Sequence, residues 1–312
     1  MREFTTTSTN PFVDPTHEVW AWEIPVYLFL GGLVAGLMII TGYFLITGRW
    51  KQSSSACYQM PGVALVLLSL GMLALFLDLE HKLYVWRLYL TFEVSSPMSW
   101  GSWILVAVYP ALLASFFFAL PEGLREGAPR LAKLSNRLQA NERAPTWIGA
   151  ISIALGIMVG IYTGILLSSL GARPLWSSSL LGPRVLVSGV STAAALVDLL
   201  ARQREERELV SRADIGFLVT ELVLIALFFI GLLNATAVHQ EAAALLLGGP
   251  YTAVFWVFVV VVGLLVPIVM QTLTAARKIP HTAVAPLLVL AGGLVFRFVM
   301  VNAGQVSQWA SL

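Results

Sequence analysis

The chain alternates between long apolar runs with few charges and short polar segments that hold most of its charged residues. Each apolar run is close to the ~20 residues that an α-helix needs to cross a bilayer. Because lipid offers no hydrogen-bond partners to the backbone, we expect runs of this length to be helices rather than open sheet. The pattern predicts eight transmembrane helices, over residues 20–47, 60–79, 99–120, 145–170, 183–201, 213–236, 251–275 and 282–305.

Composition agrees with this fold class. Of the 312 residues, 58% are hydrophobic and only 12% are charged, and the mean hydropathy is +0.81. A soluble domain averages about 45–50% apolar and 25% charged residues. We therefore expect an all-α integral membrane protein that contacts the lipid bilayer. The formal net charge of +2 says little about partners, and we expect no nucleic acid among them.

Lysine and arginine are distributed unequally between the two sides of the predicted membrane domain. Most of them lie in the loops that follow the first, third, fifth and seventh spans. The positive-inside rule assigns these loops to the cytoplasm. Both termini are then expected on the opposite side, which in a bacterium is the periplasm.

The longest basic connection, residues 121–144, divides the spans into four plus four. We expect two four-helix bundles with short periplasmic ends and interpret 121–144 as a solvated cytoplasmic linker, although "RLAKLSNRLQANER" also has the composition of a short surface helix. The expected units are a periplasmic segment 1–19, a first bundle from 20–120 with span 145–170, a second bundle 183–305, and a periplasmic tail 306–312.

The second span ends in the polar sequence "DLEHK", which begins at Asp78. On a continuous helix Asp78 and His81 share one face because they are three residues apart. A carboxylate beside an imidazole can hold a proton near neutral pH and pass it on. The alternative is a helix end meeting water, with Lys82 and Arg87 neutralising the acids. These residues alone leave the two interpretations evenly balanced.

The first span begins with Glu23 and Tyr27, four residues apart on one helix face, flanked by Trp20 and Trp22. We interpret the tryptophans as part of an interfacial aromatic belt. Glu23 is either an acid favoured at a helix start or, with Tyr27, a hydrogen-bonding pair for a ligand carbonyl or hydroxyl.

Three charged residues lie inside predicted spans, namely Asp198, Glu221 and Arg297. Buried charges in a membrane are costly, so they are expected to pair or to line a wet path. The simplest interpretation of Asp198 is a pair with Arg202, one turn away. Our hypothesis is a proton path from the cytoplasm through Asp198 and Glu221, with Arg297 in the outer half of its span.

Several cofactors are not expected in this chain. All four histidines lie at span ends or in loops, whereas a bis-histidine haem needs them inside the bundle. The single cysteine, Cys57, cannot ligate an iron–sulfur cluster alone. No spacing typical of a metal site stands out.

Four stretches together resemble the NrfD-like family, the membrane subunits of polysulfide reductase and related complexes. They are "WEIPVYLFLGGLVAG", "DLEHKLYVWRLYLTFEVSSPMSWGSW", "YTGILLSSLGARPLW" and "GGLVFRFVMVNAGQ". The SPMSWG and RPLW elements, in this order and spacing, are the most specific. The resemblance extends over essentially the whole chain.

The resemblance implies a quinone or menaquinone site without haem near the periplasmic face of a bacterial or archaeal cytoplasmic membrane. By analogy its residues are Tyr27 with Glu23, Asp78 with His81, and Tyr162, while Arg173 lines the site or docks the partner. The implied partners are an extrinsic iron–sulfur subunit with four clusters and a molybdopterin-type catalytic subunit. This chain then exchanges electrons and protons with quinone but does not act on the terminal substrate alone.

Two other functions remain open from the residues. A secondary transporter would use the same buried charges to couple substrates, although transporters typically show matching interrupted helices in both halves. A passive anchor would keep the partners and lack quinone chemistry. Neither the terminal substrate nor the direction of electron flow follows from the sequence, nor does proton translocation.

Overall fold

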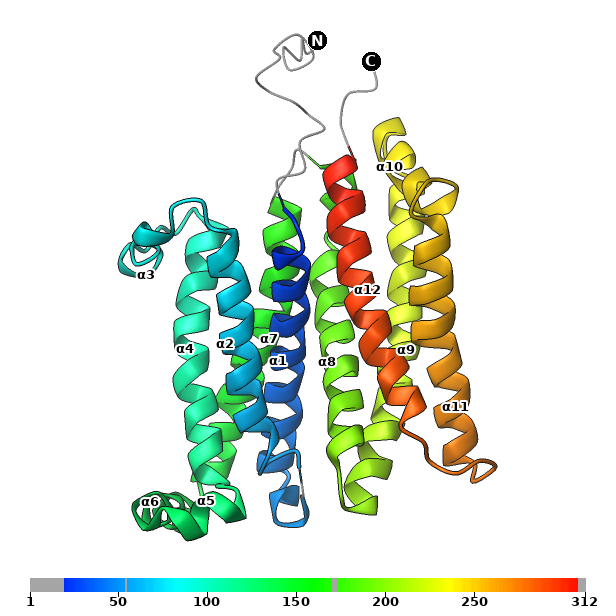
Figure 1. The fold of residues 1–312 in the computed structure, drawn as a ribbon. Coiled ribbons are helices and arrows are strands. Elements are labelled where there is room, and N and C mark those ends of the chain that lie inside the picture. Colours follow the sequence, from blue (N-terminus) through cyan, green and yellow to red (C-terminus); the bar gives the residue numbers. More distant parts are fainter. Residues whose placement is uncertain (1–19, 54, 170–172, 308–312) are drawn as a thin grey trace.

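The computed structural model describes residues 20–53, 55–169 and 173–307. Within these ranges, eight helical segments are long and apolar enough to cross a membrane, which confirms the predicted fold class. Figure 1 shows them side by side in one layered bundle. They are α1 (Glu23–Ile46), α2 (Met60–Asp78), α4 (Pro97–Phe118), α7 (Ala144–Ser169), α8 (Leu181–Leu200), α9 (Arg204–Leu233), the continuous segment η5 (Val254–Leu265) with α11 (Val266–Ala275), and α12 (Val284–Val306).

Helix α9 begins well before the predicted span at 213. The charged stretch from Arg204 to Asp214 is helical because Glu208 forms i,i+4 ion pairs with Arg204 (2.8 Å) and Arg212 (3.8 Å). A search for apolar runs detects only the part of a helix that lies in lipid. The protruding turns therefore have to be found from their charge spacing.

Shorter elements connect the spans. They are η2 (Arg49–Gln52), η3 (Lys82–Tyr84), α3 (Arg87–Leu90), α5 (Glu122–Gly127), α6 (Pro129–Ala140), η4 (Pro174–Trp176) and α10 (Ala237–Leu247). The interpretation of 121–144 as a solvated linker is wrong in its structure, because α5 and α6 occupy most of it. Ser135 and Gln139 on α6 both donate hydrogen bonds to the carbonyl of Phe118, at 3.0 and 2.7 Å, and hold α6 against the end of α4.

The spanning helices form two groups. Helices α1, α2, α4 and α7 contact one another, and so do α8, α9, η5 with α11, and α12. Helices α1 and α8 join the groups through a glycine contact. A Cβ on Gly36 would lie 2.4 Å from the carbonyl oxygen of Gly189, so only glycine permits this approach. The two groups therefore meet along a close helix–helix seam.

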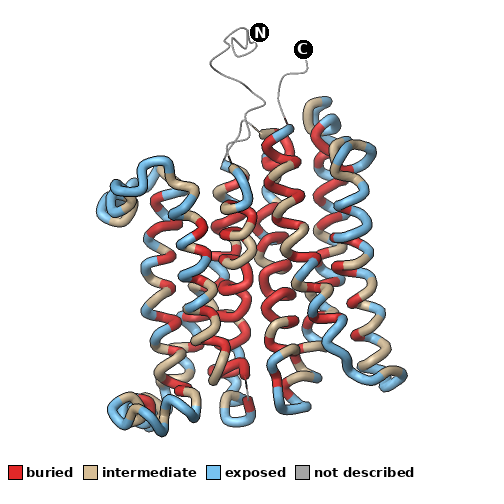
Figure 2. Tube along the Cα trace, viewed as in Figure 1, coloured by how far each residue is buried: buried red, intermediate tan, exposed pale blue. Residues whose placement is uncertain are grey.

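Burial is concentrated in the middle of this layer (Figure 2). Helix α1 is the most enclosed, and α8 and α12 follow it. Helices α2 and α9 bury much less of their surface and present apolar side chains outward, as lipid-facing helices do. The polar side chains buried along α1, α8 and α12 are thus shielded from lipid by their neighbours.

The two ends of the bundle differ in chemistry. We call the end at which α1 begins and α12 ends the motif end, where the backbone N–H of Trp20 and the side chain of Gln305 hydrogen bond. The opposite end, which holds α5, α6 and the start of α9, is the basic end.

Candidate functional site

Two buried tyrosines meet in the first helix group near the motif end. Tyr27 on α1 and Tyr162 on α7 are both buried and close enough to interact electrostatically. The tip of the Tyr162 ring lies against Gly101 on α4, where a Cβ would be 2.0 Å from Cζ and 2.1 Å from the hydroxyl oxygen. Gly101 belongs to the SPMSWG element, so this motif gives the tyrosine ring its space.

Glu23 supplies an unsatisfied acceptor at the same end. Its Oε2 atom is buried without a hydrogen-bond partner. Such an orphan is costly unless a donor completes it. Asp78, at the last turn of α2, is close enough to Glu23 for the two carboxylates to repel each other. The arrangement fits a flat ligand that carries hydroxyl donors, with phenols and carboxylates as its polar contacts.

The expected helical pairing of Asp78 with His81 is wrong. Helix α2 ends at Asp78, and Leu79 is extended with ψ 126°. His81 therefore leaves the helix face and is exposed, with its ring 6.5 Å from that of Tyr84. Lys82 interacts electrostatically with Asp78. The stretch thus combines both interpretations, a half-buried carboxylate with a solvent-facing imidazole nearby.

The rest of the SPMSWG region holds the connection between α2 and α4. The Ser99 hydroxyl donates to the carbonyl of Thr91 (3.3 Å) and accepts from the N–H of Glu93 (3.0 Å). Ser102 donates to the carbonyl of Leu88 at 2.9 Å, and the indole of Trp100 to that of Val94 at 2.8 Å. These residues are structural supports for the loop.

The RPLW element performs a similar task between α7 and α8. The indole N–H of Trp176 donates to the carbonyl of Met300 (2.9 Å), and its ring stacks on Trp20 at 5.3 Å. Arg173 donates to the carbonyl of Ser307 at 3.2 Å, and partial burial lowers its pKa. Arg173, predicted to line the site or dock a partner, is thus hydrogen-bonded to the end of α12.

A second constellation begins at the basic end of the other helix group. Both carboxylate oxygens of Asp198 lie 3.0 Å from Nε2 of His281. The sequence favoured Arg202 as the partner, but His281, which was assigned only to a loop, forms the described hydrogen bonds. The loop before α12 folds back over the end of α8 and brings the histidine there. His281 therefore links Asp198 to the surface.

The next buried carboxylate is Asp214 on α9. It accepts hydrogen bonds from Ser191 (2.6 Å) on α8 and from Gln271 (2.7 Å) on α11. It also interacts electrostatically with Asp198 on one side and Glu221 on the other. Sequence reasoning missed Asp214, although its seven-residue spacing from Glu221 puts the two on one helix face.

Glu221 and two arginines form the deepest part of this constellation. Glu221 accepts a hydrogen bond from Ser188, and it interacts electrostatically with Arg184 and Arg297. Arg297 donates to the Ser188 hydroxyl at 2.8 Å and to the carbonyl of Val185 at 3.2 Å. Both guanidinium groups are almost fully buried, at 0% and 2% exposure. A buried charge cluster of this kind marks a functional site in membrane proteins by default.

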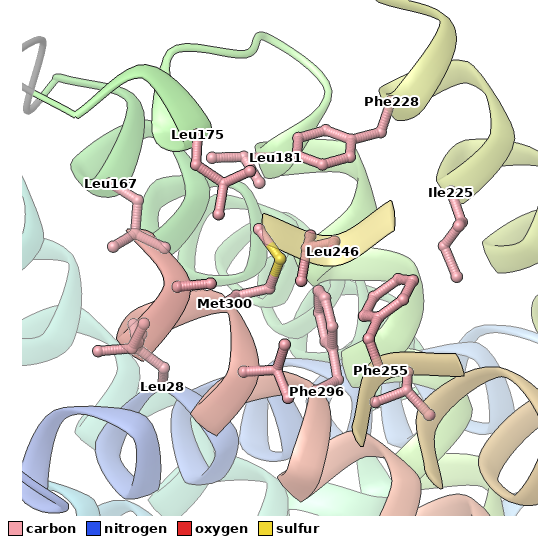
Figure 3. Close-up of a cluster of buried hydrophobic side chains, with 14 of the residues drawn as sticks. Leu28, Leu167, Leu175, Leu181, Ile225, Phe228, Leu246, Phe255, Phe296 and Met300 are labelled. Carbon is pink, nitrogen blue, oxygen red and sulfur yellow. The ribbon is translucent and has the colours of Figure 1, made fainter. Parts of the chain in front are cut away.

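Arg184 lies in an aromatic cage. Its guanidinium carbon is 4.0 Å from the ring centre of Phe296, and Phe228 and Phe255 complete the cage at 5.4 and 5.7 Å. Figure 3 shows these three rings around the Met300 side chain, whose sulfur accepts from Arg184 at 3.8 Å. Sequence reasoning placed Arg184 in an outer loop, because the apolar run around it is short.

These residues form a polar line through the second group. On α8, Arg184, Ser188, Ser191 and Asp198 follow one another at spacings of four, three and seven, which is one helix face. The deep end of the line reaches α1, because Arg297 Nη2 would lie 3.1 Å from a Cβ on Gly32. Gly32 is five residues, or about 8 Å, along α1 from Tyr27. The line thus connects the basic end to the neighbourhood of the tyrosines.

No group of three or more histidine, cysteine, aspartate or glutamate side chains in the described ranges is arranged to hold a metal ion. The polar chemistry of both constellations therefore consists of carboxylates, phenols, guanidinium groups and one exposed imidazole at each end.

Comparison with known proteins agrees with the motifs. The family description "Polysulphide reductase, NrfD" matches residues 9–308. This protein is 30% identical to a membrane-subunit relative from Wolinella succinogenes, named as a chain of polysulfide reductase, over 92% of this chain and 94% of that one. It is 29% identical to protein NrfD of Escherichia coli, covering 93% and 96% of the two chains. A subunit of selenate reductase from Mesobacillus selenatarsenatis is 24% identical, covering 94% and 75%. The protein belongs to the NrfD polysulphide reductase family of membrane subunits.

Proposed function

We propose that this chain is the quinone-reactive membrane subunit of a multi-subunit reductase in a bacterial cytoplasmic membrane. Two relatives that match most of its length are named as components of polysulfide and selenate reductases. Those names support a reductase direction, in which the chain oxidises quinol and passes electrons toward a terminal acceptor. The partners are an extrinsic iron–sulfur subunit and a molybdopterin-type catalytic subunit, which acts on the terminal substrate.

The basic end faces the cytoplasm in this proposal, and the motif end faces the periplasm. The arginines and lysines of α5, α6 and the start of α9 support this orientation through the positive-inside rule. The iron–sulfur subunit then docks at the motif end, close to the tyrosine site. Short distances between quinol and the nearest cluster are thereby achieved without a redox group inside this chain.

The observation that carries the proposal is the convergence of Tyr27, Tyr162 and the unpaired carboxylate oxygen of Glu23 at the motif end. A quinol presents two hydroxyl donors on a flat apolar ring. The phenols and Glu23 provide hydrogen-bond partners for both, while surrounding helices exclude water from the ring.

Quinol oxidation releases two electrons and two protons. The electrons leave to the iron–sulfur partner, and the protons need acceptors at the site. Glu23 and Asp78 are the carboxylates within reach of one another, and His81 is the exposed imidazole that follows Asp78. Protons released by this route leave to the periplasm.

The polar line gives the second group a separate role. His281 and Asp198 form its opening at the basic end, and Asp214 and Glu221 continue it toward Arg297. We propose that this line carries protons across the cytoplasmic half of the membrane, which makes turnover electrogenic. Asp214 and Glu221 are about 10 Å apart along α9, so ordered water is required between them.

The test is Tyr162→Phe in the complete purified complex. Removing one hydroxyl that bonds to the substrate is expected to reduce quinol-linked reduction of the iron–sulfur partner about tenfold, with assembly unchanged. Tyr43→Phe is the matched control, because Tyr43 is an exposed tyrosine at the other end of α1 and its removal is expected to leave the rate unchanged. Equal rates for both variants and the parent would refute the site. Intact assembly without any quinol-linked activity in the parent complex would instead identify a passive anchor.

A further inference from the structure

A large cationic cavity lies at the basic end, outside the tyrosine site. It has a volume of about 610 Å³ and is enclosed by the start of α9, the end of α11 and the connection to α12. Six of its lining side chains are cationic, namely Arg202, Arg204, Arg207, Arg212, Arg277 and Lys278. One carboxylate, Glu208, lines it with them. Such an excess of like charge in a concave site favours an anionic ligand.

The single carboxylate is already engaged. Glu208 forms its ion pairs with Arg204 at 2.8 Å and with Arg212 at 3.8 Å. Arg207 donates one nitrogen to the carbonyl of Ala201, while its Nε is buried without a hydrogen-bond partner. The cavity therefore retains an orphaned cationic donor that protein groups do not satisfy.

The chemistry of the lining matches a phosphate group. Arginine presents a planar fork of donors that binds phosphate oxygens in pairs, and a lysine adds a compact charge. Five arginines from two helix ends surround one concave volume. A tetrahedral oxyanion can accept from several of them at once, which a monovalent carboxylate cannot do as fully.

The position of the cavity favours a lipid over a free ion. Helix α8 ends at Leu200 and α11 at Ala275, so the cavity lies where the hydrocarbon layer ends. Helix α9 has 30 residues, about 45 Å of length, whereas the hydrocarbon core is only about 30 Å thick. Its first turns thus extend to the headgroup level. Below the cavity, Val269, Val284 and Leu287 on α11 and α12 are exposed, apolar and suited to acyl chains.

We propose that this cavity binds the phosphate of an anionic phospholipid headgroup, with the acyl chains lying along α11 and α12. Basic pockets between transmembrane helices at the cytoplasmic side commonly recognise such headgroups. The binding site does not depend on quinone chemistry. It does adjoin the polar line, because His281 lines the same cavity and is 3.0 Å from Asp198. A bound headgroup therefore lies at the opening of that line.

The first test compares lipid binding of the full chain, purified with its partner subunits, in nanodiscs of phosphatidylcholine with added phosphatidylglycerol. The double variant R212Q/R277Q is expected to bind phosphatidylglycerol about tenfold more weakly than the parent. The control R130Q/R137Q removes two exposed arginines of α6 at the same end and is expected to bind as the parent does. Equal weakening by both pairs, or by neither, overturns the site.

Two further measurements separate the ligand source and avoid dependence on folded variants. In the parent protein, phosphatidylglycerol is expected to slow acetylation of Lys278 relative to Lys133 on α6, while phosphatidylcholine leaves the ratio unchanged. Millimolar inorganic phosphate alone is expected to give little protection. Full protection by phosphate without anionic lipid would replace the lipid by a free anion, and an unchanged ratio in every condition would refute the proposal.

Discussion

The contact between Gly101 and Tyr162 allows the position of the tyrosine to be changed without altering its chemistry. A Cβ at Gly101 would lie 2.0 Å from Cζ of Tyr162, whereas ordinary contact begins at 3.4 Å. Gly101→Ala therefore requires a displacement of about 1.4 Å between the ring and α4. Misplacement of a substrate-positioning group by about 1 Å can cost 10²-fold in rate. Overpacking of this size costs about 1–3 kcal/mol of stability.

The matched control is Gly31→Ala on α1. No atom lies within 4 Å of a Cβ at Gly31, so alanine is accommodated and its higher helix propensity is expected to be neutral or slightly stabilising. Both variants add one methyl group to a membrane-spanning helix. They differ in whether that methyl meets the tyrosine ring.

The assay is quinol-linked reduction of the iron–sulfur partner in reconstituted complex, with thermal unfolding followed in parallel. We expect Gly101→Ala to assemble, to unfold at a lower temperature, and to lose about 10²-fold in rate, while Gly31→Ala retains the parent rate. A rate within about twofold of the parent for Gly101→Ala, with the structure still folded, would show that the position of Tyr162 is irrelevant to turnover. The proposed tyrosine site would then be wrong.

Three further predictions concern other parts of the molecule. Asp198→Asn is expected to abolish most of the membrane potential formed per quinol in vesicles while leaving uncoupled electron transfer within about twofold; an unchanged potential would exclude the polar line as a proton route. Glu206→Gln is expected to cost about 1–3 kcal/mol of stability, because the Glu206 carboxylate accepts from the Ser53 hydroxyl and the Ala56 N–H at 2.8 Å each; thermal unfolding measures this, and the exposed Glu205→Gln serves as control. Burial raises the pKa of the Cys57 thiol, so a maleimide is expected to label this single cysteine only after unfolding, and fast labelling of the folded protein would contradict its burial.

The transmembrane helices follow closely from the sequence because each depends on local composition. A run of apolar residues near 20 long has one stable state in lipid, so seven of the predicted spans begin and end within a few residues of the structure. The start of α9 was missed because its first turns are polar and extend beyond the lipid. Helix α6 was underestimated because its docking depends on the Phe118 carbonyl, which no local pattern indicates.

The candidate site was harder to predict because it depends on contacts between distant helices. Tyr27, Glu23, Asp78 and Tyr162 were named from the family motifs, but their packing against Gly101 required three dimensions. The helical pairing of Asp78 with His81 failed because an extended Leu79 ends the helix.

The second constellation shows the same limit. Arg184 and Asp214 are spaced along their helices with other polar residues, so a search for polar residues at intervals of three, four and seven would have found them. The partnership of Asp198 with His281 spans 83 residues and is set by how the loop before α12 folds back. Local spacing cannot supply it.

The most direct test of the central claim is to map where quinone binds. A photoreactive azidoquinone, cross-linked to the purified complex and located by mass spectrometry, is expected to label the start of α1, the end of α2 or α7 near Tyr162. Excess unlabelled quinol is expected to suppress that labelling. Suppressible labelling confined to the basic half, for example in the apolar cavity lined by Tyr43, Phe44 and Phe217, would contradict the account and move quinone chemistry to the other side of the membrane.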